Sequence, residues 1–140
     1  MIVAVLDANV VVSAVLSPAG TPANVLKAWR AERFGLVLSL AILEEIYRVL
    51  HYPKIAVRHQ WSEAQIRTFV DLLASQAVLT PGILNLSVIA DDPADDRYLE
   101  CAMEGHADFL VTGDRLLLNL GVYQHITILT PRAFLDVLQV

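Results

Sequence analysis

The chain has 140 residues, a length typical of one compact domain, and we expect residues 1–140 to fold as a single domain. Hydrophobic residues make up 56% of the sequence and charged residues 18%, which excludes an intrinsically disordered chain. The net charge of −5 argues against a general electrostatic attraction to nucleic acid, so any such binding must be local.

The sequence also carries signals about the compartment in which the protein works. No stretch approaches the ~20 consecutive apolar residues that cross a bilayer, and the N-terminus lacks the basic region and cleavage site of an export signal. The single cysteine, Cys101, cannot form an internal disulfide, which fits a reducing environment. We therefore expect a cytoplasmic protein that does not span a membrane.

The first half of the chain is expected to contain a strand, two helices, a second strand and a third helix, at residues 2–6, 9–16, 21–32, 36–38 and 41–51. Residues 2–6 form an unbroken apolar run rich in β-branched side chains, which is typical of a buried parallel strand, and Asp7 ends it. Thr21 before Pro22 indicates a helix N-cap followed by proline at the first helical position. The third helix should stop before Pro53.

The second half is expected to contain a helix, a second helix, a strand, a short helix, a strand and a last helix, at residues 62–75, 92–105, 109–112, 113–118, 126–129 and 130–138. Ser62, followed three residues later by Gln65, forms a capping-box pattern. Proline follows a capping residue at 92–93 and at 130–131, which marks the starts of two further helices.

Strands separated by helices predict the α/β class, with right-handed crossovers and a mostly parallel sheet covered on both faces. In such sheets ligands bind beyond the carboxyl ends of the strands. Asp7 directly follows the first predicted strand, and Asp114 follows the strand at 109–112. Each acid is equally suited to cap the helix after it, but together they predict a shared crevice.

Two neighbouring glutamates can be separated by helical geometry. Glu44 has Arg48 four residues later, which indicates an exposed ion pair. Glu45 instead lies at the border of the apolar stripe that contains Ile42 and Val49. A carboxylate held there needs a metal ion, a distant cation or a raised pKa, so we consider Glu45 a functional candidate.

Five acids crowd into ten positions: Asp91, Asp92, Asp95, Asp96 and Glu100. We expect Asp92 to cap a helix, Asp95 to be a first-turn acid stabilised by the helix dipole, and Asp91 to be a loop residue. Asp96 lies one turn before Leu99, at the edge of the packed face. Periodicity does not choose between Asp95 and Asp96, because both flank Leu99.

Carboxylates packed together repel one another, so such a cluster should hold protons or bind a hard divalent cation. Oxygen-only ligands favour Mg²⁺ or Mn²⁺, and the four scattered histidines do not form a zinc-like pattern. Acidic sites of this kind cleave phosphodiester bonds by activating water and neutralising the charge of the phosphate. Basic residues that could contact RNA, or equally lie solvated on the surface, are Arg48, Lys54, Arg58, Arg97 and Arg115.

Five segments occur in a familiar order, at residues 7–14, 17–23, 38–46, 91–99 and 111–114. Each is a weak signal alone, but the ordered set resembles the PIN-domain family over nearly the whole chain. The resemblance implies a three-layer α/β/α fold with a mostly parallel central sheet, and hydrolysis of RNA that depends on a divalent metal.

The resemblance also implies four acids as catalytic residues and metal ligands: Asp7, Glu45, Asp96 and Asp114. Asp96 is preferred over Asp95 because the third family acid is matched three residues before Leu99. The sequence departs from a common pattern at Leu116 and Leu117, where many relatives carry a further acid. The number of metal ions, one or two, therefore stays open.

Within this family the chain is most similar to the toxin components of toxin–antitoxin systems, the VapC-like ribonucleases. That likeness implies an endoribonuclease that forms a homodimer and is neutralised by a cognate antitoxin protein. Two alternatives remain: an RNA-processing nuclease that is not a toxin, and a catalytically decayed PIN-like module that binds RNA or protein. A phosphatase with Asp7 as nucleophile is disfavoured, because such enzymes usually carry a second acid where this chain has Asn9.

Overall fold

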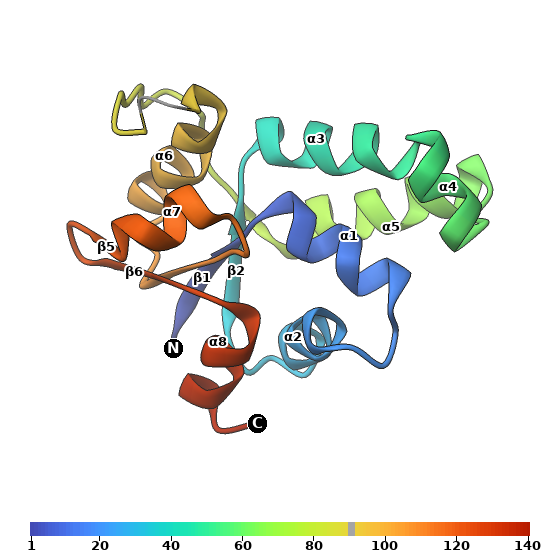
Figure 1. Ribbon diagram of the computed structural model, residues 1–140, viewed down its shortest axis with the longest axis horizontal. Helices are drawn as coiled ribbons and strands as arrows, with labels where there is room; N and C mark the ends of the chain where they lie inside the picture. The colour runs from blue at the N-terminus through green and yellow to red at the C-terminus, as the bar shows by residue number, and fades with distance from the viewer. Residues whose placement is uncertain (90–91) are drawn as a thin grey trace.

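The computed structural model describes residues 1–89 and 92–140 (Figure 1). Within them, six strands form one sheet in the order β3-β2-β1-β4-β6-β5. Their bounds are β1 Val3–Leu6, β2 Gly35–Leu38, β3 Val78–Leu79, β4 Phe109–Val111, β5 Val122–Tyr123 and β6 Ile126–Leu129. Neighbouring strands pair in parallel except at one edge, where β5 runs antiparallel to β6.

Helices flank this sheet on both sides. They are α1 Ala8–Leu16, α2 Thr21–Arg30, α3 Leu40–Leu50, α4 Pro53–His59, α5 Glu63–Gln76, α6 Asp96–Glu104, α7 Arg115–Leu120 and α8 Pro131–Leu138. In Figure 1, α6 lies on one side of β1 and β2, and α1, α2 and α3 lie on the other. The α/β fold with a mostly parallel sheet is therefore confirmed.

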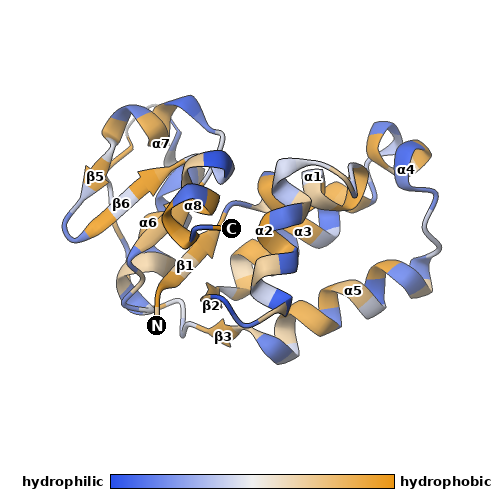
Figure 2. Cartoon of the chain, turned by 90° about the horizontal axis from the view of Figure 1, so that it is seen from below, coloured by the Kyte–Doolittle hydropathy of each residue, from blue (hydrophilic) through white to orange (hydrophobic). Residues whose placement is uncertain are grey.

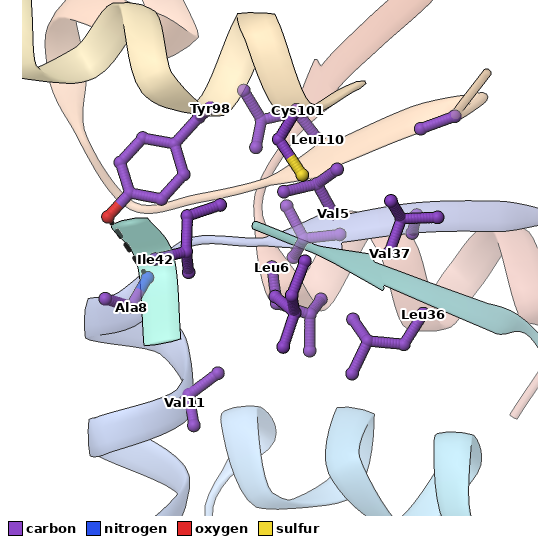
Figure 3. Packing of buried hydrophobic residues seen from close by; sticks show 14 of the residues in the cluster. Val5, Leu6, Ala8, Val11, Leu36, Val37, Ile42, Tyr98, Cys101 and Leu110 are labelled. Carbon is purple, nitrogen blue, oxygen red and sulfur yellow. Dashed lines mark hydrogen bonds between the residues drawn. The ribbon is translucent and has the colours of Figure 1, made fainter. Parts of the chain in front are cut away.

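The centre of the core is β1, as its unbroken apolar sequence predicts. Ala4, Val5 and Leu6 have no exposed surface, because β2 and β4 pair with both edges of the strand and helices cover both faces. Figure 2 shows β1 coloured as hydrophobic along its length. Side chains of the three central strands pack together in Figure 3, among them Val5, Leu6, Leu36, Val37 and Leu110. This packing fixes the strand ends that carry the site.

Helix starts follow the sequence signals in most places. The capping box at the start of α5 is confirmed, since the Ser62 hydroxyl accepts from the Gln65 amide and the Gln65 side chain accepts from the Ser62 amide. Thr130 caps α8 as predicted. The predicted Thr21 cap is wrong: Thr21 is already helical, and Gly20 precedes it as an N-cap without a side-chain hydrogen bond.

Four elements differ from the predictions or were not predicted. The helix α3 ends before Pro53 as predicted. Pro53 is also the first residue of α4, a helix that was not predicted. The two-residue strands β3 and β5 are too short to show a period in the sequence. The helix expected at 92–105 is divided into a 3₁₀ turn, Pro93–Asp95, and α6, which begins at Asp96.

The segment 82–89, which leads from β3 towards α6, is held by side chains rather than by a strand. Three carboxylates spaced four residues apart on α6, Asp96, Glu100 and Glu104, accept its backbone N–H groups. The donors are the amides of Gly82, Ile83, Leu84, Leu86, Val88 and Ile89. This spacing places the acceptors along one face of the helix, so the segment runs beside α6.

Within residues 1–89 and 92–140, no helix is both long enough and apolar enough to cross a bilayer.

The close approach of α6 to β2 can be tested by a substitution at Gly105. A Cβ atom at Gly105 would overlap the Val37 side chain and lie 3.2 Å from the Cys101 carbonyl oxygen. We expect Gly105→Ala to lower the free energy of unfolding by about 1–3 kcal/mol, measured by urea denaturation. Gly113→Ala, where a Cβ meets open space, is the matched control and should change it by less than about 0.5 kcal/mol. Equal losses in the two variants would contradict this packing.

Candidate active site

The site lies where the chain reverses direction across the sheet. From β1 the chain moves outward through β2 to β3 and then returns to β4, on the other side of β1. The carboxyl ends of β1 and β4 therefore flank the point at which α/β folds form a ligand crevice. Pairing of the two strands continues past Leu6, because the Asp7 amide donates to the Val111 carbonyl at 3.0 Å.

Asp7 is a buried acid with both carboxylate oxygens engaged. Its Oδ1 accepts from the Asn9 amide at 2.9 Å, so Asp7 is the N-cap of α1. Its Oδ2 accepts from the Thr112 hydroxyl at 2.6 Å. Only 3% of Asp7 is exposed to solvent, so the cap and the strand end fix the carboxylate in one orientation.

Thr112 connects the two predicted strand-end acids. Its fully buried hydroxyl donates to Asp7 and accepts from the Asp114 amide at 3.0 Å. Sequence reasoning missed this residue because Thr112 was taken as the last position of a strand. A hydroxyl directly before Gly113 and Asp114 was the signal available in the sequence.

Three acids converge beside this junction. Asp92, Asp95 and Asp114 each offer a carboxylate oxygen, and these oxygens lie within 4.8 Å of one another. Asp114 also caps α7, because its Oδ1 accepts from the Leu116 and Leu117 amides. Asp95 is 6% exposed, and its buried Oδ2 has no hydrogen-bond partner among residues 1–89 and 92–140. An unpartnered buried carboxylate oxygen is costly unless a cation or a proton joins it.

The electrostatics of Asp95 follow from this crowding. Burial raises the pKa of Asp95 to about 7, and the charges of Asp114, Asp92 and Asp7 act in the same direction. A divalent cation among these oxygens would reverse the repulsion. The donor set fits Mg²⁺ or Mn²⁺, because it consists of carboxylate oxygens and one of its acids, Asp95, has a buried oxygen without a hydrogen-bond partner in the part of the chain that the structure describes.

Glu45 reaches the same region from α3. Its Oε2 accepts from the Tyr98 hydroxyl at 2.7 Å, and the Tyr98 oxygen accepts from the Ala8 amide at 3.3 Å (Figure 3). Burial raises the pKa of Tyr98, as do the negative charges of Asp7 and Glu45, so the hydroxyl stays protonated and donates. Glu45 is thus linked through one side chain to the residue that follows Asp7.

The structure brings Asp95 into the acidic group, whereas sequence reasoning selected Asp96. The Oδ1 of Asp96 accepts from the Val88 and Ile89 amides, at 3.0 and 2.9 Å, so this carboxylate holds segment 82–89. Asp92 caps the 3₁₀ turn rather than α6, since its Oδ1 accepts from the Ala94 amide and the N-cap of α6 is Asp95. Asp91, expected to be a loop residue, lies outside the described residues.

Comparison with known proteins adds two findings. The sequence model of the PIN domain matches residues 3–116, a stretch that contains all the acids described above. An uncharacterized protein of Methanocaldococcus jannaschii, MJ1680, is 27% identical over 140 residues, covering 94% of this chain and 88% of that protein. The similarity therefore extends over nearly the full length of both chains.

The Thr112 hydroxyl provides a stability test of the junction. Thr112→Val keeps the shape of the side chain but leaves the Asp7 Oδ2 and the Asp114 amide without their partner. We expect the free energy of unfolding to fall by roughly 2 kcal/mol in urea denaturation with EDTA present. Thr112→Ser retains the hydroxyl and should lose less. Identical unfolding midpoints for the two variants would show that the hydroxyl does not stabilise the junction.

The pKa of Asp95 predicts how the metal-free stability depends on pH. Because the folded pKa of about 7 exceeds the ordinary value of 3.8, the folded state keeps a proton that the unfolded state releases between about pH 4 and 7. Stability from this group should therefore fall as pH rises through that window, by roughly 2 kcal/mol.

Asp95→Asn removes this titration and should stabilise the metal-free protein at pH 8 relative to the parent. Urea denaturation in EDTA at pH 5 and pH 8 measures both effects. Asp71→Asn, at an exposed position of α5, is the control and should keep the pH dependence of the parent. If Asp95→Asn also keeps it, crowding at Asp95 is not its source.

Proposed function

Because the chain belongs to the PIN-domain family, we propose that it is a divalent-metal-dependent endoribonuclease, with Asp7, Glu45, Asp95 and Asp114 as its catalytic acids. The observation that carries the proposal is the Asp95 carboxylate, which offers an oxygen within 4.8 Å of oxygens of Asp92 and Asp114 and whose buried Oδ2 lacks a hydrogen-bond partner among the described residues. This arrangement has a ready physical explanation if a cation belongs there.

The chain's own residues divide the work between them. Asp95, which belongs to the group of three acids, and Asp7, which lies outside that group, are the ligands that we assign to Mg²⁺ or Mn²⁺. Glu45 and Asp114 complete the acidic environment. Thr112 keeps Asp7 fixed through the bond to its Oδ2. When bound, the cation supplies activation of water and neutralises the negative charge of the phosphate. Asp95 replaces Asp96 in this assignment because Asp95 lies in the acidic group with Asp92 and Asp114 and has a buried oxygen without a partner among the described residues.

RNA must be attracted locally, because the whole chain carries a net charge of −5. Arg97 and Arg115 are exposed, and each directly follows an acid of this region in the chain, Asp96 or Asp114. We assign phosphate contacts to these two arginines. Contacts of this kind position the substrate without reading its sequence.

As a biological role, we propose that of the toxin in a toxin–antitoxin pair, acting as a homodimer and neutralised by a cognate antitoxin. The resemblance to VapC-like ribonucleases supports this role. An apolar groove of about 270 Å³ lined by Val15, Pro18, Leu26, Trp61 and Phe69 offers surface for a protein partner. A gene for a small protein beside the coding sequence would support the role, and its absence would favour an RNA-processing nuclease.

Cleavage of RNA by amide variants tests the assignment of the acids. We expect Asp7→Asn and Asp95→Asn to lower kcat/KM on the order of 100-fold or more, with Mg²⁺ and with Mn²⁺, because each removes a charged ligand oxygen. Asp96→Asn is the matched control. Its side-chain carbonyl oxygen still accepts from the Val88 and Ile89 amides, so activity should stay within about threefold of the parent.

The activities of these variants distinguish Asp95 from Asp96 as the catalytic acid, and activity of the parent distinguishes a nuclease from a binding module. Loss of activity in Asp96→Asn but not in Asp95→Asn would return Asp96 to the catalytic set. A parent protein that binds RNA without cutting it, and takes up no Mn²⁺ in calorimetric titration, would identify a binding module. Leu116 and Leu117, which stand in place of a further family acid, are the feature that favours a binding module.

A further inference from the structure

Tyr98 has polar contacts that the fold alone does not require. Its ring packs in the core, and only 3% of the residue is exposed. Its hydroxyl nevertheless accepts from the first amide of α1 (Figure 3) and donates to the carboxylate of Glu45 on α3. We propose that Tyr98 is a positioning residue of the metal site, which holds the Glu45 carboxylate beside the end of β1 through this hydrogen bond. The inference rests on the proposed metal-dependent function.

The hydroxyl is fully used in this position. It donates its proton to Glu45 Oε2 at 2.7 Å and accepts from the Ala8 amide at 3.3 Å. The Ala8 amide belongs to the first turn of α1, where N–H groups have no partner inside the helix. Tyr98 thus joins three elements, α1, α3 and α6, at the carboxyl end of β1. A phenylalanine would fill the same core space and make neither bond.

Glu45 has need of such a partner. It is half-buried at the edge of α3 and carries three side-chain torsions, so without a fixed bond its carboxylate can turn towards water. Among the hydrogen bonds of residues 1–89 and 92–140, Tyr98 supplies the side-chain donor to Oε2, and none involves Oε1. The bond therefore fixes one oxygen and leaves the other available to a cation. Partners that orient a ligand in this way commonly change metal affinity about 10- to 100-fold.

Mn²⁺ titration calorimetry of four proteins tests the inference: the parent, Tyr98→Phe, Glu45→Gln and the double variant. We expect Tyr98→Phe to weaken Mn²⁺ binding about 10-fold in the parent background. In the Glu45→Gln background the same change should alter binding by less than about twofold, because Tyr98 acts through Glu45. Tyr123→Phe, at a half-buried position of β5, is the matched control and should bind Mn²⁺ like the parent.

A second measurement uses the natural tyrosine at position 98, so it does not depend on whether Tyr98→Phe folds. In the parent chain, the ¹³Cζ resonance of Tyr98 should shift when Mg²⁺ is added, and it should not shift in Glu45→Gln. Thermal unfolding in EDTA reports separately how much the hydroxyl stabilises the fold.

Several results would overturn the inference. Unchanged Mn²⁺ affinity in Tyr98→Phe, or an equal loss in both backgrounds, would leave Tyr98 a structural residue while the proposed metal site stands. A Tyr98 resonance that ignores Mg²⁺ in a parent that binds it would lead to the same conclusion. A parent that binds neither ion would remove the proposed function itself, and the positioning role with it.

Discussion

The parallel pairing of β1 with β4 is the constraint on which the site depends. The register places Leu6 opposite Val111, and the Asp7 amide extends the pairing by one further bond. Only this alignment lets the Thr112 hydroxyl reach Asp7 while it accepts the Asp114 amide. The other acids are delivered to the same junction by helices packed on the sheet. A core built on a fully buried strand thus tolerates crowded negative charge at its edge.

The fold was predictable where the sequence carries long or chemically distinct signals. The buried strand β1, the capping box of α5 and the Thr-Pro start of α8 follow from apolar runs and capping chemistry. The strands β3 and β5 contain two residues each, and their pairing is decided by neighbours far away in sequence. The helix α4 was missed for a different reason: Pro53 was treated as a stop signal, although proline starts helices equally well.

The sequence predicts the location of the candidate site better than it predicts the contacts within it. Asp7 and Asp114 follow strands, so their convergence follows from the parallel topology. The choice between Asp95 and Asp96 does not, because the 3₁₀ turn before α6 changes the angular position of each residue, and an α-helical period cannot represent that change. The Thr112 hydroxyl directly follows β4, and Tyr98 lies between Arg97 and Leu99 on α6. Their acidic partners, Asp7 and Glu45, come from other elements, so the local sequence does not reveal these two bonds.

The path of segment 82–89 is fixed largely through its backbone and less through its side chains. Its attachment runs through main-chain N–H groups, while the Ile83 side chain is 81% exposed. Exposed positions such as Ile83 are therefore free to vary in residue type, proline excepted, since proline has no N–H to give, whereas Leu86, Val88 and Ile89 pack against the core. Chain length is not free in the same way, because six of its N–H groups must meet carboxylates on a helix that rises 1.5 Å per residue. A deletion here would shift every later residue out of step, up to the turn that carries Asp95.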